Sequence, residues 1–492
     1  MGFFEITKEL LNVAFTENGD KAYATTGNAC LDYYSLVGGM RFNLKDALYL
    51  FMKAYLEDPI KAIKILFYTR DIREGLGERS IFRFTFNTFA SMYPEVAKEL
   101  LKFIPVYGRY DDLLACFDSP IRKEVMNIVK EQLQKDLEAK KNNEPISLLA
   151  KWLPSVNASN FETIDLACRI AQSLGMSKKE YRQMLAFLRK GVIIENNLRE
   201  KDYSFSYDKI PSNASFKYRK AFLREDEERY TKYLEDVKKG NAKINTKVLY
   251  PYEVIRVLER NNYLEEELDS LDVIWNNYPR ENIASRTIVV RDGSGSMLDD
   301  NAVSANSVAT SLALLFAEQL TGEFKNKFIT FSSKPELVEV KGKTIFEKFV
   351  NISKYNDYLN TSIEAVYNLI LNVYKSPKFN KEDALERIVI ISDMEFDMAN
   401  CMYGIYDKPE ETTYEVFKKE LEQLNVKVPE VVFWNVRSRN IHFPVCDEPN
   451  VRLVSGASLN IIKLITNNDV NSAIELMDEC LEKYSCFNEI KL

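Results

Sequence analysis

The sequence predicts an α plus α/β protein, in which an N-terminal helical-repeat module is followed by a doubly wound parallel-sheet domain. Apolar residues from Leu44 to about Asp269 recur at spacings of three and four, as on one face of a helix. After Pro279, short β-branched runs alternate with helical stretches, which is typical of a parallel sheet covered by helices. We therefore expect one domain over residues 1–280 and a second over 281–492.

The helical part is divided by glycine and proline into segments of the length expected for packed helical hairpins. No strict sequence period is present, so a degenerate repeat array is an inference from segment length alone. The dividing positions are Gly75-Leu76-Gly77, Tyr93-Pro94, Ile104-Pro105, Ser119-Pro120, Leu153-Pro154, Ile210-Pro211 and Tyr250-Pro251.

The second part contains apolar strands and amphipathic helices in alternation. Ligands of such sheets bind at the carboxyl ends of the strands. The expected strands are 286–290, 327–332, 387–391, 431–435 and 451–454, and the expected helices are 305–320, 361–374, 413–424 and about 472–484.

Composition excludes several classes of protein. The 492 residues are 46% hydrophobic and 28% charged, as in folded soluble proteins, and no apolar run is long enough for a membrane span. The first residues lack the pattern of a secretory signal, and the seven scattered cysteines indicate reduced thiols, so we expect a cytoplasmic protein. The only histidine, His442, argues against His-based catalysis and multi-histidine zinc sites. We expect it in a loop, and we expect no enzyme.

Positive charge is concentrated in one stretch of the helical part. Residues 178–224 contain 12 basic and 5 acidic residues, whereas the whole chain has a net charge of −7. An RNA-binding face and an ordinary solvated helical surface both fit this pattern. Aromatic residues in the same stretch, among them Tyr203, Phe205 and Tyr207, fit either base stacking or packing against helices. The candidate RNA-binding residues are Lys178, Lys179, Arg182, Arg189, Lys190, Arg199, Lys217, Arg219, Lys220 and Arg224.

Oxygen-bearing side chains follow two of the predicted strands. Asp292, Ser294 and Ser296 come after the first strand, and Asp393 ends the third, while Thr361 begins the intervening helix. Short hydroxyl side chains let the backbone approach an ion, and hard cations such as Mg²⁺ prefer oxygen ligands. Each element alone is also typical of an ordinary turn. Their order and strand context together predict a site for Mg²⁺, or another hard divalent cation, made by these five residues.

Two further acidic residues, Glu395 and Asp397, follow Asp393 closely. They resemble a catalytic carboxylate pair. A solvated cluster, or one that supports the metal ligands, fits the surrounding pattern better.

The segment Val290-Arg291-Asp292-Gly293-Ser294-Gly295-Ser296-Met297 resembles the metal-site signature of von Willebrand A domains. It is most similar to the variety found in Ro-type RNA-binding proteins, which join a ring of HEAT-like helical repeats, the TROVE module, to such a domain. A poorly characterised branch of that superfamily resembles the chain over most of its length. The matching segments include residues 38–43, 68–79, 104–113, 151–155, 210–214, 392–397 and 428–435.

The resemblance implies a ribonucleoprotein scaffold that binds small structured or single-stranded RNA. Three features depart from the family pattern: Arg291 places a cation beside Asp292, Asn360 stands where glycine is common, and the helical part is almost neutral. The alternative is a protein-interaction module, in which bound Mg²⁺ accepts an Asp or Glu carboxylate of a partner. The sequence leaves open whether the helices close into a ring.

Overall fold

The computed structural model describes residues 7, 11–190, 194–281, 283, 286–298, 303–356, 362–397, 411–467 and 472–492. Contacts divide the chain into two compact units. The first comprises Met1–Ile65, Glu74–Leu76 and Thr246–Ser485, and the second comprises Leu66–Arg73, Gly77–Asn245 and Cys486–Leu492. This division differs from a single boundary near residue 280, because the first helices of the chain pack with the sheet.

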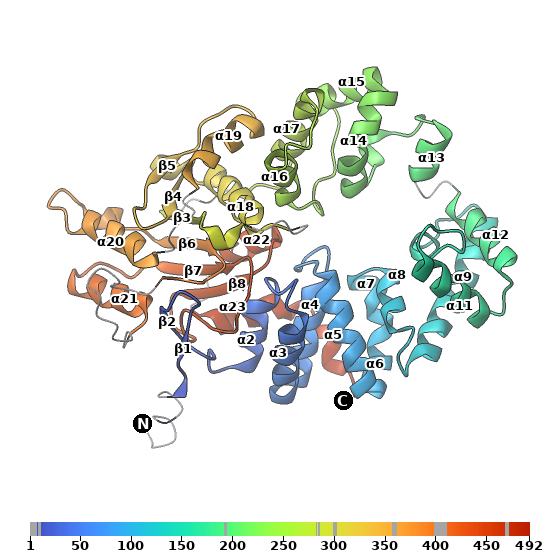
Figure 1. Cartoon of the computed structure of the whole chain (residues 1–492), viewed down its shortest axis with the longest axis horizontal. Coiled ribbons are helices and arrows are strands. Elements are labelled where there is room, and N and C mark those ends of the chain that lie inside the picture. Colours follow the sequence, from blue (N-terminus) through green and yellow to red (C-terminus); the bar gives the residue numbers. More distant parts are fainter. Residues whose placement is uncertain are drawn as a thin grey trace. The chain divides into compact units, whose positions relative to one another are not determined.

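A six-stranded sheet forms the core of the first unit (Figure 1). Its order is β5-β4-β3-β6-β7-β8, and all neighbouring pairs are parallel except β4 and β5. The predicted parallel sheet is thus confirmed, whereas the short edge strand β5 is absent from the predicted elements. The strands are β3 (Thr287–Asp292), β4 (Lys327–Phe331), β5 (Leu337–Glu339), β6 (Arg387–Ser392), β7 (Glu430–Asn435) and β8 (Val451–Ser455).

The strand order reverses between β3 and β6. From β3 the chain passes to β4 and β5 on one side, and then returns to β6 on the other. At such a reversal, the connections from two adjacent strands run in opposite directions. The crevice between them, at the carboxyl ends of the strands, is where ligands bind in open α/β sheets. Arg291 lies opposite Ile391 in the register, so Asp292 and Ser392 come next at the carboxyl ends of their strands.

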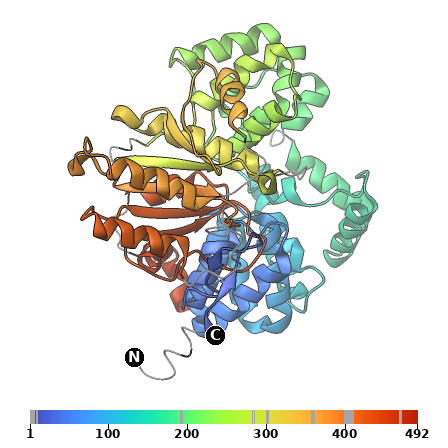
Figure 2. The same ribbon diagram turned by 60° about the vertical axis from the view of Figure 1, so that its left-hand side comes forward.

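Helices cover the sheet. Helix α18 (Ala305–Gln319) begins at Ser304, whose side chain accepts a hydrogen bond from the Ser307 amide, and it packs on β3 and β6. Helices α20 (Ile363–Tyr374) and α21 (Thr413–Gln423) lie side by side (Figure 2), with the rings of Tyr367 and Phe417 stacked 4.1 Å apart. The unit also contains α16 (Pro251–Glu259), α17 (Leu268–Asn276), α19 (Ile345–Ile352), α22 (Asn460–Asn467) and α23 (Ala473–Glu482).

The N-terminal residues add a hairpin and two helices to this unit. Strands β1 (Ala14–Phe15) and β2 (Lys21–Ala22) pair in antiparallel fashion, and α2 (Ala29–Val37) and α3 (Leu44–Glu57) follow. Gly38, at the end of α2, meets the last residue of β8 so closely that a Cβ atom would lie 2.3 Å from the Ser455 carbonyl oxygen. The absence of a side chain at Gly38 therefore allows α2 to pack on the sheet.

The described elements of the second unit are all helical. An apolar cluster from α9, α10, α11 and α12 forms part of its core, and α12 begins with a capping box between Ser177 and Glu180. The prediction of a helical region is confirmed; its HEAT-like character stays a prediction. Its helices are α5 (Arg79–Met92), α6 (Pro94–Leu100), α7 (Ile104–Tyr107), α8 (Tyr110–Leu113), α9 (Arg122–Lys141), α10 (Leu149–Trp152), α11 (Phe161–Ser173), α12 (Lys178–Arg189), α13 (Ile194–Glu200), α14 (Ser212–Glu225) and α15 (Glu227–Lys238), and α4 (Pro59–Arg70) joins the two units.

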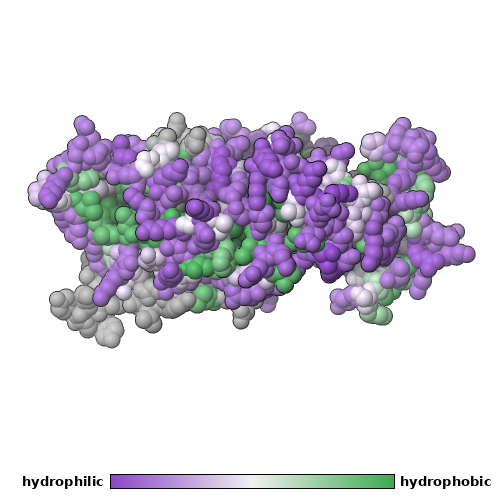
Figure 3. All heavy atoms as spheres, turned by 90° about the horizontal axis from the view of Figure 1, so that it is seen from above, coloured by the Kyte–Doolittle hydropathy of each residue, from purple (hydrophilic) through white to green (hydrophobic). Residues whose placement is uncertain are grey.

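The molecular surface is mostly hydrophilic on the face drawn in Figure 3, where hydrophobic areas lie between hydrophilic side chains. Within the described residues, no helix has both the length and the apolar character needed to cross a bilayer.

Candidate functional site

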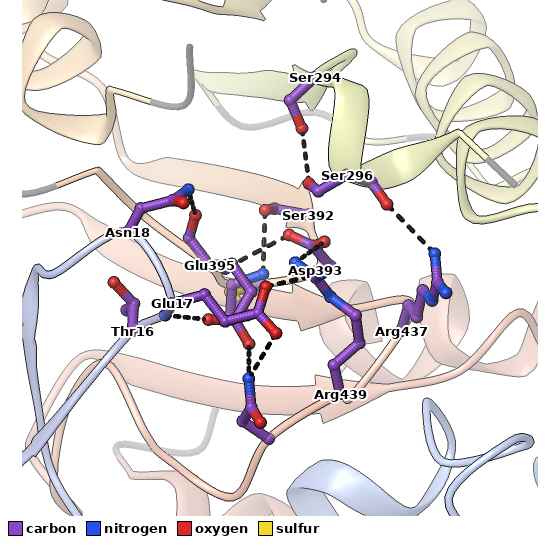
Figure 4. A network of polar contacts seen from close by, with 12 residues as sticks. Thr16, Glu17, Asn18, Ser294, Ser296, Ser392, Asp393, Glu395, Arg437 and Arg439 are labelled. Atoms are coloured by element: carbon purple, nitrogen blue, oxygen red, sulfur yellow. Dashed lines mark hydrogen bonds and ion pairs between the residues drawn. The ribbon is translucent and has the colours of Figure 1, made fainter. Parts of the chain in front are cut away.

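The end of β3 forms one half of the candidate metal site. Asp292 is fully buried, and its Oδ1 accepts a hydrogen bond of 2.9 Å from the Ser294 amide as the chain turns. The hydroxyl oxygens of Ser294 and Ser296 lie 3.0 Å apart and point toward each other (Figure 4). The turn thus gathers one carboxylate and two hydroxyl groups.

The end of β6 supplies the other half. Ser392 Oγ donates a 2.6 Å hydrogen bond to Asp292 Oδ2, and the Ser296 side chain hydrogen-bonds to that of Asp393. Asp393 is 1% exposed, and its Oδ2 lies 3.1 Å from Nη2 of Arg439. The structure therefore brings together four of the five predicted ligands; the fifth, Thr361, lies outside the described residues.

Both carboxyl groups are held in surroundings that disfavour their negative charge. Burial raises the pKa of Asp292, and the nearby Asp393 raises it further. Burial also raises the pKa of Asp393, although Arg439 and the hydrogen bond with Ser296 oppose that change. A hard divalent cation would supply the missing positive charge, and carboxylate and hydroxyl oxygens are suitable ligands for it.

The described part of the chain contains no group of three or more Asp, Glu, His or Cys side chains arranged to hold a metal. The candidate site has only two such residues, because its remaining oxygen donors are serines. A metal ion held there would complete its shell with hydroxyls, water or a ligand from outside.

Arg291, the cation beside Asp292, is directed into a buried polar network. Its Nη2 donates to Asn306 Oδ1 at 2.8 Å and to Asn356 Oδ1. Asn306 in turn donates to Glu259 Oε1 at 2.8 Å, and Glu259 also pairs with Arg256. The network connects β3 to α18 and α16, so the charge of Arg291 serves packing between these elements.

Glu395 connects the metal-site loop to the N-terminal hairpin. It is 1% exposed, and its Oε2 accepts a 2.7 Å hydrogen bond from the Glu17 amide, while Asn18 donates to its carbonyl oxygen (Figure 4). His442 Nε2 lies 3.1 Å from Glu395 Oε1. Burial raises the pKa of Glu395, but the nearby His442 together with the hydrogen bonds from the Glu17 amide and Asn440 lower it overall.

Glu395 is thus buried rather than solvated, and it positions the loop that carries Asp393. His442 lies in a loop, as expected, but at 4% exposure it is a core residue. The contribution of residues 16–18 has no counterpart in the sequence analysis, because no local pattern links residues so far apart in the chain.

In the second unit, the basic stretch divides into exposed and internal residues. Arg189 donates to the carbonyl oxygens of Ala150 and Leu153 and to Ser155 Oγ at 2.6–2.8 Å, and so attaches α12 to the segment after α10. Arg219 is 5% exposed and donates to the Phe216 carbonyl. Lys220 is partly buried, and the candidates that remain exposed are Lys178, Lys179, Arg182, Lys190, Arg199, Lys217 and Arg224.

Part of this exposed group surrounds a hollow of about 770 Å³ between α12, α13 and the segment after α10. Its lining includes the cationic side chains of Arg182, Lys190 and Arg199, the amides of Asn157 and Asn196, and the acidic residues Glu200 and Asp202. Guanidinium, ammonium and amide N–H groups around an open cavity provide suitable donors for phosphate oxygens.

The three alternating aromatic residues pack among the helices. The Tyr207 ring is 5.1–5.2 Å from the rings of Phe222, Tyr230 and Tyr233. Tyr203 and Phe205 continue this cluster toward the surface. The packing interpretation of these residues therefore fits the structure better than base stacking.

Comparison with known proteins gives a family without an assigned activity. A model described as a domain of unknown function, DUF2828, matches residues 16–106 and 121–278, together about half of the chain. The chain belongs to the DUF2828 family. A second domain of unknown function, DUF7788, matches residues 286–486.

This DUF2828 protein is similar to the uncharacterized protein L728 of Acanthamoeba polyphaga mimivirus. The two are 29% identical over 519 residues, which cover 96% of this chain and 88% of the relative. Among solved structures, the Ro (RSR) protein of Deinococcus radiodurans aligns over 90% of this chain and 92% of its own, with 10% identity and a TM-score of 0.34. The resemblance to TROVE and von Willebrand A modules stays a prediction.

Proposed function

We propose that the protein is a non-enzymatic RNA-binding scaffold whose α/β unit holds Mg²⁺. The observation that carries the RNA proposal is the hollow lined by Arg182, Lys190 and Arg199. Arg182 lies on α12, Lys190 follows the end of that helix and Arg199 lies on α13, and the described structure gives none of them an acidic partner. Phosphate groups of RNA supply the complementary charge.

The metal part of the proposal rests on Asp292 and Asp393. Both are buried at adjacent strand ends, and Ser294 and Ser296 add hydroxyl oxygens beside them. A bound Mg²⁺ would neutralise the two carboxylates and hold the loops after β3 and β6 in place.

The RNA proposal is tested with charge reversal at the hollow. We would measure the binding of a fluorescein-labelled oligouridylate by anisotropy for the wild type and for Arg182→Glu/Lys190→Glu/Arg199→Glu. The matched control reverses three exposed lysines of α9 (Lys123→Glu/Lys130→Glu/Lys135→Glu), which changes net charge equally.

The hollow variant should bind at least about tenfold more weakly than the α9 variant and show a smaller salt dependence, because each lost phosphate contact removes counterion release. Circular dichroism verifies folding. Equal binding by the two variants would exclude the hollow as the RNA site.

A second candidate function is metal-dependent protein binding. Ser296 is only partly buried and Gly295 is exposed, so the candidate metal site opens toward solvent on one side. A partner's carboxylate would then complete the Mg²⁺ shell. An aspartate-containing peptide should bind in Mg²⁺ but not in EDTA, and the same peptide with asparagine should not bind; equal binding of both peptides would contradict this function.

A further inference from the structure

Three sequence segments far apart in the chain meet around a cluster of arginines in the helical unit. Arg70 ends α4, Arg83 lies on α5, and Asp112 lies on α8. Asp112 is buried, and its two carboxylate oxygens lie 2.7 Å from Nε of Arg70 and 2.6 Å from Nε of Arg83. Asp111 pairs with Arg83 at 2.6 Å, so the two acids neutralise these two arginines.

Arg109, at the start of α8, forms no such ion pair within the described residues. Its guanidinium stacks on the Trp152 ring, with 4.4 Å between the guanidinium carbon and the ring centroid. Within the described residues, no carboxylate or carbonyl oxygen accepts a hydrogen bond from this guanidinium. Burial lowers the pKa of Arg109, and the charges of Arg70 and Arg79 lower it further, while Asp111 and Asp112 oppose this change.

The surroundings of Arg109 favour an anion. Lys151 Nζ lies 5.5 Å from the centroid of the same Trp152 ring. A stacked, partly buried guanidinium close to other cations favours an oxyanion over water, because the anion offsets both the partial desolvation and the neighbouring positive charges. The aromatic ring also holds the planar donors in one orientation, which reduces the entropy lost on binding.

The same ring lies close to the hollow already described. Ser155 lines that hollow. It follows Trp152 by three residues, so the Cα atoms of Trp152 and Ser155 are at most about 11 Å apart. Arg189 attaches the intervening segment to α12 through Leu153 and Ser155. A single extended nucleic-acid strand is long enough to contact both places.

We propose that Arg109, oriented by Trp152, is a second phosphate-binding site, and that it holds a backbone phosphate of the RNA strand whose neighbouring phosphates enter the hollow. This inference rests on the proposed RNA-binding function. It adds a specific contact outside the 178–224 stretch, from segments of the sequence that have no excess of positive charge.

Trp152 makes the site observable by fluorescence. The protein has three tryptophans, and the other two, Trp275 and Trp434, are 0% exposed in the other unit. Unlabelled oligouridylate and, separately, sodium phosphate should change the tryptophan emission of the wild type. Neither should change that of Trp152→Phe, which keeps an aromatic ring beneath Arg109.

The affinity test compares Arg109→Gln with Arg122→Gln. Arg122 also stacks on an aromatic ring, with 4.2 Å to the Phe117 centroid, but its Nη2 already donates to Ser173 Oγ. Arg109→Gln should weaken oligouridylate binding roughly tenfold or more, as expected for a lost hydrogen bond to a charged group. Its salt dependence should fall by about 0.7 in logarithmic slope, the value for one phosphate of a single strand. Arg122→Gln should bind like the wild type.

The outcomes separate this inference from the proposed function. If the wild type binds oligouridylate and Arg109→Gln binds it equally well, the second site is excluded and the hollow stands. If the wild type binds no RNA, the proposed function falls. The change of tryptophan emission on addition of sodium phosphate then decides whether Arg109 is an anion-binding site. An emission change with phosphate that Arg109→Gln lacks would support a site for a small phosphorylated ligand, and no change would overturn the site.

Discussion

Ser392 donates its hydroxyl to Asp292 Oδ2 over 2.6 Å and so joins the ends of two neighbouring parallel strands. The bond holds the Asp292 carboxylate at the reversal of strand order, where Asp393 follows directly. This relationship between β3 and β6 positions the candidate metal ligands relative to each other, and the first two predictions depend on it.

Removing the two hydroxyl ligands should abolish divalent binding. In Ser294→Ala/Ser296→Ala, the carboxylates of Asp292 and Asp393 remain, but the two hydroxyl groups, half of the described candidate ligands, are removed. We expect isothermal calorimetry to detect no Mg²⁺ binding, with an unchanged circular dichroism spectrum. Ser91→Ala/Ser173→Ala, at exposed helical positions, is the control. Wild-type Mg²⁺ affinity in the first variant would rule out the assignment.

Removing Arg439 should strengthen Mg²⁺ binding. Its guanidinium lies 3.1 Å from Asp393 Oδ2 and 2.7 Å from Glu17 Oε2, and it competes with a cation for Asp393. For Arg439→Gln we expect an affinity increase of about fivefold, corresponding to roughly 1 kcal/mol for a partly exposed charge pair. Arg286→Gln, which removes an exposed ion pair near the start of β3, should leave the affinity unchanged. A weaker affinity in Arg439→Gln would show that the arginine supports the site.

The buried ion pair of Arg70 and Asp112 should be important for stability. Both side chains are at most 2% exposed, so Asp112→Asn leaves a buried guanidinium without its counter-charge. The free energy of unfolding should fall by about 3–5 kcal/mol, measured by urea denaturation. Asp118→Asn breaks an exposed pair with Arg169 and should cost less than about 1 kcal/mol. Similar losses in the two variants would contradict the difference expected from burial.

Glu253 should make stability depend on pH. Burial raises its pKa from 4.5 to about 7, although a backbone hydrogen bond with Tyr250 and the charge of Arg41 oppose the change. A raised pKa in the folded state means that the protonated form is favoured, so the contribution of Glu253 to stability is highest below pH 4.5 and falls as pH rises through 7.

Glu253→Gln should therefore be more stable than the wild type at pH 8 by on the order of 1–2 kcal/mol, and equally stable below pH 5. Thermal unfolding at the two pH values measures the difference. Glu228→Gln, at an exposed position of α15, is the control. A constant difference at both pH values would show that the effect of Glu253 is unrelated to its titration.

Local patterns were sufficient to predict five strands of the main sheet, most of the helical region and one end of the candidate site. Helical spacing and proline positions predicted the helical region, and β-branched runs predicted β3, β4, β6, β7 and β8 with shifts of one or two residues at their ends. The position of Asp292 at a strand end follows directly from the run before it. These features depend on neighbours in the chain, whose side chains lie on one face or alternate between faces.

Contacts between distant residues decided the rest. Nothing near Glu395 in the chain indicates that Glu17 and Asn18 cover it, and nothing near Arg109 indicates that its ring partner is Trp152. Charge counting also placed Arg189 and Arg219 with the surface cations, whereas the fold uses both for internal hydrogen bonds. Composition measures how much charge a segment carries. Whether that charge meets solvent, a carbonyl or another cation depends on which segments pack against it, and only the tertiary structure specifies that packing.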